Sequence, residues 1–470
     1  MKWACLALAG ILALTACQSG EDRAIAELTQ AEQAGEIAGA HSIRVADAEP
    51  TRLLRSSITP ESRFRIASLT KVLTQIAILR LADQGELSLD QSLASLRPNL
   101  RAEWPETVTI RHLLNFSSGL PHELGNEGEG VRFDARGSAL AFMDAQTESG
   151  PRFPPGSRTA YSNLGYLHLG AVIEAVTGQT YAEAIHTLVS QPVGLTETGF
   201  GRDDLGEDGH LHGWEGDPPV QVSGHPISQR YSSGGLHASL RDMERLSAAL
   251  QEEDFLSPAA QDEFFTQFGR PDARDPAYMM ATGHVPGFTH AWLVSRDPEF
   301  TIISLNNAIA GNPRVIPDTV TRAGSAFLPS LAERRDRYRP TASDGWTAIR
   351  GFDDMPDHDL REGLTATLNA ILSGSEQQAR DALMRLHGLD PTTADEADLE
   401  DFSGFARGHI RITAAFGPFH PIAWRLDGER LQIYLESEDN QRGIHFAAQP
   451  SDHNPAVAST VSLGTYGFDP

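Results

Sequence analysis

The sequence predicts an α+β protein built from two parts, a large N-terminal one and a small C-terminal one. Before residue 330, apolar residues recur at helix spacing after position 71, and positions 291–295 and 301–305 are typical of strands. After about residue 345, amphipathic helices at 359–372 and 376–386 precede strands at 422–426 and 431–435, which flank an Asp427-Gly428 turn. With 470 residues, 40% of them hydrophobic, the chain is long enough for a globular core in more than one domain.

The N-terminus is typical of an exported protein. Lys2 precedes an apolar run at 5–14 that is too short to span a bilayer, so residues 1–16 are expected to be a signal peptide. The run continues into Leu-Thr-Ala-Cys ending at Cys17, which resembles the lipobox of bacterial lipoproteins. That resemblance implies lipidation of Cys17, and Gln18 implies sorting to the periplasmic face of the outer membrane. A plain signal peptide with an incidental cysteine is the alternative.

Cysteine content and charge limit the partners. Cys5 would leave with the signal and Cys17 would carry the lipid, so the mature domain would have no disulfide. The net charge is −25, and loss of Lys2 makes it −25 − 1 = −26. An acidic surface repels nucleic acid and anionic lipid, so we expect no nucleic-acid partner and membrane attachment through the lipid anchor only.

The mature chain keeps a single lysine. Lys2 and Lys71 are the only lysines among 38 basic residues, and the other 36 are arginine. A desolvated lysine can give up its proton near pH 7, whereas a guanidinium effectively cannot. Lys71 is therefore a candidate catalytic base.

Ser68 lies three residues before Lys71, in the pattern Ser-x-x-Lys. Positions i and i+3 share a helix face, and the apolar residues from Val72 to Leu81, followed by Gly85, predict a helix here. Ser68 would then lie in its first turn, where free amides favour developing negative charge. Ser-x-x-Lys alone is a weak pattern, and further motifs are needed to support a nucleophile.

Four further motifs follow in order: "TIRHLLNFSSGLP" at 109–121, "PGSRTAYSN" at 155–163, "SSGGL" at 232–236 and "TGHVPGF" at 282–288. Together with Ser-x-x-Lys, this order resembles class C β-lactamases and their relatives, the D-alanyl-D-alanine carboxypeptidases and family VIII esterases, within the serine β-lactamase and penicillin-binding protein superfamily. The resemblance covers roughly residues 30–330. It implies an antiparallel sheet flanked by helices, with a helical subdomain.

The resemblance also implies roles for matching residues. Ser68 would form an acyl-enzyme, and Lys71 and Tyr161 would share the proton transfers. Asn163 would orient Lys71 and bind the acyl side of the substrate. Thr282, Gly283 and His284 would form the third motif, and the backbone amides of Ser68 and His284 would form an oxyanion hole. For Tyr161 the alternative is a core tyrosine, and for Asn163 it is a turn or helix-start residue.

The third motif departs from the family pattern. Such proteins usually carry Lys-Thr-Gly or His-x-Gly, whereas this chain has Ala281-Thr282-Gly283. Ala281 cannot hold a substrate carboxylate, and a lost charge-assisted contact costs about 1.5–3 kcal/mol. This change disfavours β-lactams and D-alanyl peptides and favours neutral esters, although the His284 side chain is an alternative cation.

Other candidate sites are weaker. No Gly-x-Ser-x-Gly elbow is present. His210 and His212, near Glu215 and Asp217, have a metal-like spacing, but they stand in a Gly/Asp/Pro-rich stretch that predicts a solvated loop. His112 and His122 are expected to be structural. We expect no metal and no cofactor.

The expected organisation is a signal at 1–16, a tether at 17–24, a catalytic domain at 25–332, a linker at 333–344 and an accessory α+β domain at 345–470. The expected function is hydrolysis of an ester or amide, esterase-like or D-alanyl peptidase-like, through Ser68. The alternatives are a non-catalytic lipoprotein that binds cell-wall fragments or a protein partner, favoured by Ala281, and a class C-like β-lactamase.

Overall fold

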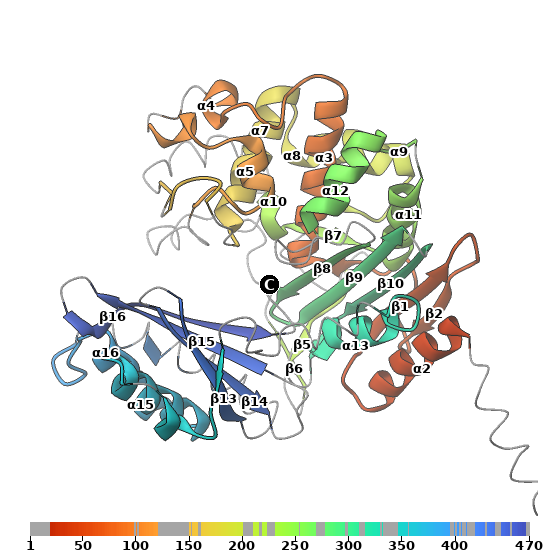
Figure 1. Ribbon diagram of the computed structural model, residues 1–470. Coiled ribbons are helices and arrows are strands. Elements are labelled where there is room, and N and C mark those ends of the chain that lie inside the picture. The colour runs from red at the N-terminus through yellow and green to blue at the C-terminus, as the bar shows by residue number, and fades with distance from the viewer. Residues whose placement is uncertain are drawn as a thin grey trace, which may run out of the picture. The chain divides into compact units, whose positions relative to one another are not determined.

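In the computed structural model the chain folds into two compact units, with the boundary between Pro329 and Ser330 (Figure 1). The residues that the structure describes are 19–97, 100, 103–120, 150–151, 153–157, 161–200, 210–215, 219–222, 231–252, 254–268, 278–296, 299–309, 315–329, 331, 346–355, 357–394, 399, 402–403, 406, 410, 419–427, 430–437, 443–451 and 454–466.

The first unit is built on a five-stranded antiparallel sheet of order β2-β1-β10-β9-β8. The N-terminal hairpin thus joins the last three strands, with Ile43 opposite Ile302. Strands β9 and β10 are buried on both faces, as expected for a sheet covered on both sides. The strands are β1 (Gly39–Val45), β2 (Thr51–Leu54), β8 (Tyr278–Val285), β9 (Phe288–Arg296) and β10 (Glu299–Asn306).

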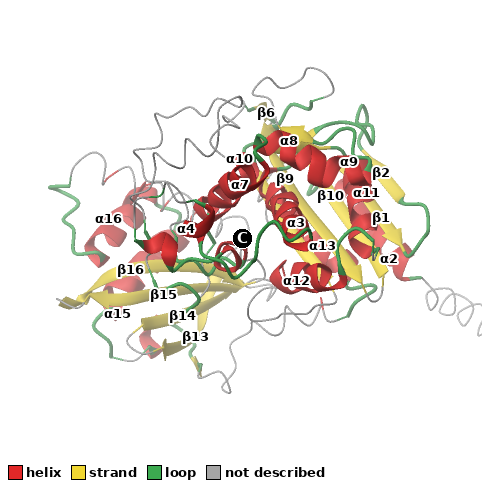
Figure 2. Ribbon diagram, turned by 90° about the horizontal axis from the view of Figure 1, so that it is seen from above, coloured by secondary structure: helices red, strands yellow, loops and turns green. Residues whose placement is uncertain are grey.

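Helices cover the two faces of this sheet (Figures 1 and 2). Helices α2 (Gly20–Gln33) and α13 (Val315–Gly324) pack together on one face. On the other face lie α11 (Leu240–Gln251) and α12 (Pro258–Phe268), together with the short helix η1 (Ala67–Leu69).

In the residues that the structure describes, the segment between η1 and α11 contains mainly helices. Its elements are α3 (Thr70–Asp83), α4 (Leu93–Leu96), η2 (Trp104–Glu106), α5 (Ile110–Leu114), α7 (Asn163–Thr177), α8 (Tyr181–Ile185), η4 (His186–Ser190), α9 (Gln191–Val193) and α10 (Tyr231–Gly234). Short strands form two three-stranded sheets, β3-β7-β4 and β11-β5-β6; they are β3 (Phe64–Arg65), β4 (Gly199–Phe200), β5 (Trp214–Glu215), β6 (Val220–Gln221), β7 (Leu236–Ala238) and β11 (Ala308–Ile309).

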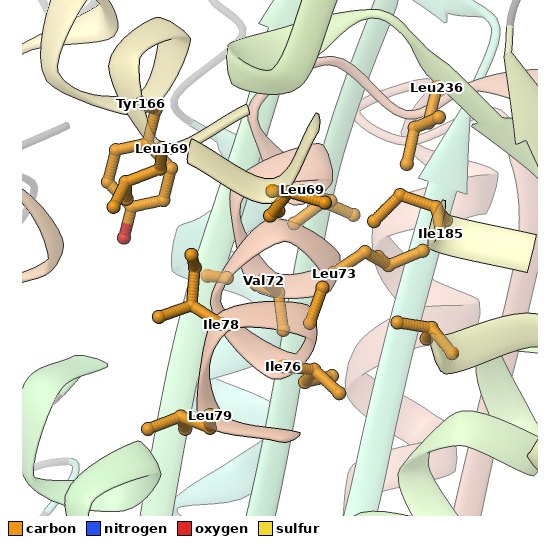
Figure 3. Close-up of a cluster of buried hydrophobic side chains, with 14 of the residues drawn as sticks. Leu69, Val72, Leu73, Ile76, Ile78, Leu79, Tyr166, Leu169, Ile185 and Leu236 are labelled. Carbon is orange, nitrogen blue, oxygen red and sulfur yellow. The ribbon is translucent and has the colours of Figure 1, made fainter. Parts of the chain in front are cut away.

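Helix α3 forms the centre of the core. Its apolar side chains point to all sides and meet residues from α7, α8 and β7, as Figure 3 shows for Leu73, Ile185 and Leu236. A helix that is apolar all round is stable only inside a larger core, because each buried aliphatic side chain contributes about 1.5–3 kcal/mol. The helix ends before Gly85, whose φ of +74° suits the left-handed turn that follows it.

The second unit is a small α+β domain. Its sheet is antiparallel, of order β12-β13-β14-β15-β16, and helices α15 and α16 pack together and share an apolar core with it. The elements are β12 (Thr347–Ala348), η7 (Phe352–Asp354), α15 (Arg361–Leu372), α16 (Glu376–Leu386), β13 (Phe419–Asp427), β14 (Arg430–Ser437), β15 (Gly443–Ser451) and β16 (Asn454–Tyr466).

The predicted α+β class is confirmed, and so are the helix after Ser68 and the pairs of helices and strands in the second unit. The predicted tether at 17–24 is wrong from Gly20 on, because helix α2 begins there. Ser19 and Asp22 form a reciprocal capping box, and Arg23 donates a hydrogen bond of 3.0 Å to the carbonyl of Ala326. The signal peptide, Cys17 and the linker at 333–344 lie outside the described residues. Within the described parts of the chain, no helix has the length and apolar character needed to cross a membrane.

Buried histidines predict how stability depends on pH. Burial lowers the pKa of His41, His168 and His237 to about 3 and that of His290 to about 4, from 6.5. The folded state therefore keeps these rings neutral, while the unfolded chain binds protons as the pH falls below 6.5. The free energy of unfolding should be largest above pH 6.5 and fall by about 1 kcal/mol per pH unit for each histidine as the pH drops towards 4.

Urea unfolding between pH 7 and pH 4.5, followed by circular dichroism, measures this slope. A His41→Gln variant should show a shallower slope, because one of the protons bound on unfolding is gone. Equal unfolding free energies at pH 7 and pH 5 in the unmodified protein would contradict the prediction.

Candidate active site

Ser68 stands at the junction between strand β3 and helix α3. The chain leaves β3 at Arg65, turns through η1 and enters α3 at Thr70. Ala67 has a φ of +49°, a left-handed conformation that costs a non-glycine residue roughly 1–3 kcal/mol. This turn leaves Ser68 half-buried, two residues before the first residue of α3.

The amine of Lys71 is buried beside Ser68. Lys71 is 2% exposed, and its Nζ lies 3.2 Å from Ser68 Oγ, 2.7 Å from Asn163 Oδ1 and 2.6 Å from the carbonyl oxygen of Ser233. A buried amine needs such oxygens, because an uncompensated charge in the interior costs several kcal/mol. The aromatic rings of Tyr161 and Tyr166 add two π faces, with centroids 4.8 Å and 5.6 Å from Nζ.

Tyr161 faces Ser68 from the other side. Its hydroxyl donates a hydrogen bond of 2.8 Å to Ser68 Oγ. The ring stacks on Phe116, with centroids 4.9 Å apart and planes 25° from parallel. Phe116 follows α5 with a φ of +55°, so the turn after α5 fixes a ring against which Tyr161 is held.

Asn163 is the first residue of helix α7. The side chain of Ser162 caps that helix by accepting a hydrogen bond of 2.9 Å from the amide of Gly165. The cap fixes the helix start, and Asn163, 4% exposed, places its carbonyl oxygen on Lys71. The structure thus brings Ser68, Lys71, Tyr161 and Asn163 together from two segments of the chain.

The carbonyl of Ser233 belongs to the same site, although the sequence did not identify it. The motif at 232–236 runs along α3, and three of its backbone groups bond to that helix. Thr74 Oγ1 donates to the carbonyl of Ser232 at 2.7 Å, Lys71 donates to Ser233, and the amide of Leu236 donates to Thr70 Oγ1 at 3.1 Å. Every residue type carries a backbone carbonyl, so the identity of residue 233 does not predict this contact. Only the motif at 232–236 could have indicated that this segment lies at the site.

A buried carboxylate anchors this motif. Glu174 of α7 accepts hydrogen bonds from the Tyr231 hydroxyl and, at 2.9 Å, from the amide of Tyr181. Burial and the neighbouring carboxylate both raise the pKa of Tyr231, so its hydroxyl remains a donor at any working pH. Tyr231 itself has a φ of +30°, which this contact helps to maintain.

The third motif lies on edge strand β8, directly against the Ser68 turn. A methyl group at Gly283 would lie 2.4 Å from the carbonyl oxygen of Ile66 and 3.3 Å from the amide nitrogen of Leu69. Only glycine therefore allows β8 to come this close. Because side chains alternate along a strand, Ala281 shares the sheet face of Gly283, whereas Thr282 and His284 belong to the opposite face.

The side chain of His284 is engaged away from that face. It is exposed, and its Nδ1 lies 2.8 Å from Thr289 Oγ1 across the β8–β9 hairpin. This placement favours a backbone role for His284 and does not support its side chain as a substitute for the missing cation at Ala281.

The other histidines have structural surroundings. The predicted solvated loop is wrong for His210, which is 5% exposed and packs edge-on against His237 with centroids 4.5 Å apart. His212 pairs with Gln221 at 2.9 Å. His112 closes a capping box with Thr109, as expected of a structural residue, while His122 lies outside the described residues. The described residues contain no cluster of three or more His, Cys, Asp or Glu able to hold a metal ion.

Comparison with known proteins identifies the family. The family model described as Beta-lactamase matches residues 32–302, which include Ser68, Lys71, Tyr161, Asn163 and the third motif.

Two curated relatives match part of this chain. The chain is 36% identical over 194 residues to esterase EstB of Burkholderia gladioli, covering 38% of this chain and 48% of the esterase. It is 34% identical over 146 residues to penicillin-binding protein 4 of Amycolatopsis lactamdurans, covering 30% of this chain and 37% of that protein. The chain therefore spans about half, or less, of the length of these relatives.

A solved structure extends the likeness in fold. The D-amino acid amidase from Ochrobactrum anthropi SV3, complexed with D-phenylalanine, superimposes with a TM-score of 0.56 at 19% identity, over 66% of this chain and 100% of that one. At this identity the comparison shows a common fold.

Gly283→Ala tests the close approach of β8 to the Ser68 turn. The added methyl group meets backbone atoms that cannot move independently, so the variant should lose about 1–3 kcal/mol of stability. Gly165→Ala is the matched control, because its methyl group would lie 3.5 Å from the nearest atom and alanine favours the helix. The midpoints of urea unfolding measure the stability of the two variants. A Gly283→Ala variant as stable as Gly165→Ala would refute the close approach of β8 to the Ser68 turn.

Proposed function

The chain belongs to the beta-lactamase family, and from this premise we propose that it is a serine hydrolase that cleaves an ester or amide through an acyl-enzyme on Ser68. The observation that carries the proposal is the contact of Ser68 Oγ with two groups able to move a proton, Lys71 at 3.2 Å and Tyr161 at 2.8 Å. A serine hydroxyl is a weak nucleophile until an adjacent base accepts its proton.

Two proton placements satisfy the same contacts. In one, Lys71 is a neutral amine that accepts the Ser68 proton and donates its own hydrogens to Asn163 and Ser233, while Tyr161 donates to Oγ. In the other, Lys71 is an ammonium ion that donates to all three oxygens, and the phenolate of Tyr161 accepts the Ser68 proton. In both placements, the Lys71–Tyr161 pair gains the proton of Ser68 as Oγ attacks.

The reaction then proceeds in two steps, acylation and deacylation. Oγ forms a bond to the substrate carbonyl carbon, the bond to the leaving oxygen or nitrogen breaks, and the Lys71–Tyr161 pair returns its proton to the leaving group. Water next attacks the acyl carbon, the pair takes a proton from the water, and the proton returns to Oγ as the acid departs. No cofactor is needed for either step.

The amides of Ser68 and His284 would stabilise the tetrahedral intermediate as an oxyanion hole. Ser68 lies at the start of α3, and β8 is pressed against this turn at Gly283. Two preorganised amide donors in a largely buried site act mainly on the transition state, where negative charge develops on the carbonyl oxygen. Asn163 would hold Lys71 and offer its amide group to the acyl side of the substrate.

Ala281 bears on the choice of substrate. The face of β8 that meets the Ser68 turn carries a methyl group where related proteins place a cation, and Ala281 is 7% exposed. With a net charge of −25, the protein also repels anions at long range. We therefore favour neutral or cationic esters and amides over β-lactams and D-alanine-terminated peptides, whose carboxylates need a cation.

The N-terminal sequence supports a location for this activity. The signal-like run before Cys17 and the lipobox pattern support export and lipid attachment. The hydrolase would then act from the periplasmic face of the outer membrane, held by its lipid rather than by surface charge.

Labelling with a fluorophosphonate probe tests the nucleophile, with intact-mass detection on the chain from residue 18 onwards. The unmodified protein should gain one adduct, Ser68→Ala should gain none, and Lys71→Arg should label about 10²–10⁴ times more slowly, because a guanidinium cannot take part in the proton transfer. Arg80→Lys, on the same helix, is the control and should label at the normal rate. A folded, unmodified protein that gains no adduct would refute the proposal and favour a binding lipoprotein.

Ala281→Lys tests the substrate preference. A cation on this face should raise kcat/KM for the anionic β-lactam nitrocefin, relative to neutral p-nitrophenyl butyrate, by tenfold or more, corresponding to about 1.5–3 kcal/mol for a charge-assisted contact. Ala281→Met adds similar length without charge and should not change the ratio. If both variants shift the ratio equally, the effect is steric and the electrostatic explanation fails.

A further inference from the structure

His290 lies next to the candidate oxyanion hole, and the proposed reaction does not use it. It stands on β9 directly opposite Gly283 of β8, so both residues share the sheet face that meets the Ser68 turn. The ring is 0% exposed, packed edge-on against Phe64 with centroids 6.1 Å apart. A fully buried imidazole is most stable when both of its nitrogens have partners within the protein.

Both ring nitrogens have backbone partners. Nε2 lies 2.6 Å from the carbonyl oxygen of Arg65, and Nδ1 lies 3.2 Å from the amide nitrogen of Asn306. A carbonyl can only accept and an amide nitrogen can only donate, so the ring is neutral with its proton on Nε2. Burial, which lowers the pKa of His290 to about 4, agrees with a neutral ring.

These two bonds connect the rigid sheet to the segment before Ser68. Asn306 ends β10 and is itself fixed, because its side chain accepts from the amide of Ala38 at 2.8 Å and donates to the carbonyl of Thr289 at 3.1 Å. Arg65, at the other end, lies three residues before Ser68 and just before the strained Ala67. His290 therefore links the sheet that carries β8 to the start of the nucleophile turn.

We propose that His290 is a positioning residue that sets the distance between the Ser68 turn and strand β8, and thereby aims the amides of Ser68 and His284 at one substrate oxygen. This inference rests on the proposed function. Gly283 allows the two segments to approach, and the Nε2–Arg65 hydrogen bond holds the turn in place. A shift of about 1 Å between two oxyanion donors can lower kcat about 100-fold, because such donors act on the transition state.

The test compares three variants of the full mature chain. His290→Leu removes both bonds, while His290→Gln keeps an amide donor near the position of Nε2. His41→Leu is the matched control: His41 is also 0% exposed on this sheet, and its Nδ1 lies 2.9 Å from Ser304 Oγ, away from the Ser68 turn. Thermal midpoints establish that each variant is folded at the assay temperature.

Two measurements separate positioning from general destabilisation. The first is the split of kcat and KM for p-nitrophenyl butyrate, and the second is inhibition by phenylboronic acid, whose tetrahedral adduct places an oxygen between the two amides. For His290→Leu we expect kcat to fall about 10- to 100-fold with little change in KM, and boronate affinity to fall in parallel. His290→Gln should recover much of both losses, and His41→Leu should lower only the thermal midpoint.

The outcomes are distinguishable from those of the hydrolase proposal. An unmodified protein that no fluorophosphonate labels would refute the hydrolase, and with it this inference. A labelled and active protein whose folded His290→Leu variant keeps its kcat and boronate affinity would overturn the role of His290 alone. Equal loss of kcat in His41→Leu would also overturn it, because the effect would then follow from weakening the sheet.

Discussion

The structure of the site depends on one requirement, that the amine of a buried lysine be surrounded by oxygens. Lys71 is 2% exposed, and the oxygens that meet it come from the helix start of α7 and from the turn at Ser233. Neither segment is near Lys71 in sequence, so both must be held by other contacts. Much of the helical region holds these two segments in place.

Each support can be traced to a particular interaction. The Ser162 cap fixes the first turn of α7, and with it Asn163. The Ser233 carbonyl is held because the motif around it bonds to Thr70 and Thr74 on the same helix as Lys71, and because Glu174 binds Tyr231 at its start. Helix α3 thus carries Lys71, follows directly on the turn that holds Ser68, and is the frame on which their surroundings are built. This explains why it is buried on every side (Figure 3).

The sequence predicted some parts of the site and not others, and the reasons are physical. Ser68 and Lys71 were predictable because Lys71 is the only lysine after Lys2, and because i and i+3 share a helix face. The Ser233 carbonyl and the partners of His290 were not, because they depend on strand register and on backbone groups that any residue type carries. The tether was mispredicted because the polar residues after Cys17 look like a solvated segment, although Ser19 and Asp22 form a capping box. His210 was mispredicted because a loop-type composition does not reveal burial against a strand that is distant in sequence.

The two walls of the site are built differently, and this has a consequence for its chemistry. The wall formed by α3, α7 and the Ser233 turn is fixed by bonds around Lys71, whereas the β8 wall meets the Ser68 turn through the bare backbone of Gly283. On that second wall Ala281 stands where the family pattern places a cation. The residues proposed to move protons are therefore present, while a cation that would bind an anionic substrate is absent from this position. Under the proposed function, the residues that are present would act on any acyl group and the missing one would act only on carboxylates. The change would therefore alter substrate choice without requiring any change in the acyl-transfer chemistry itself.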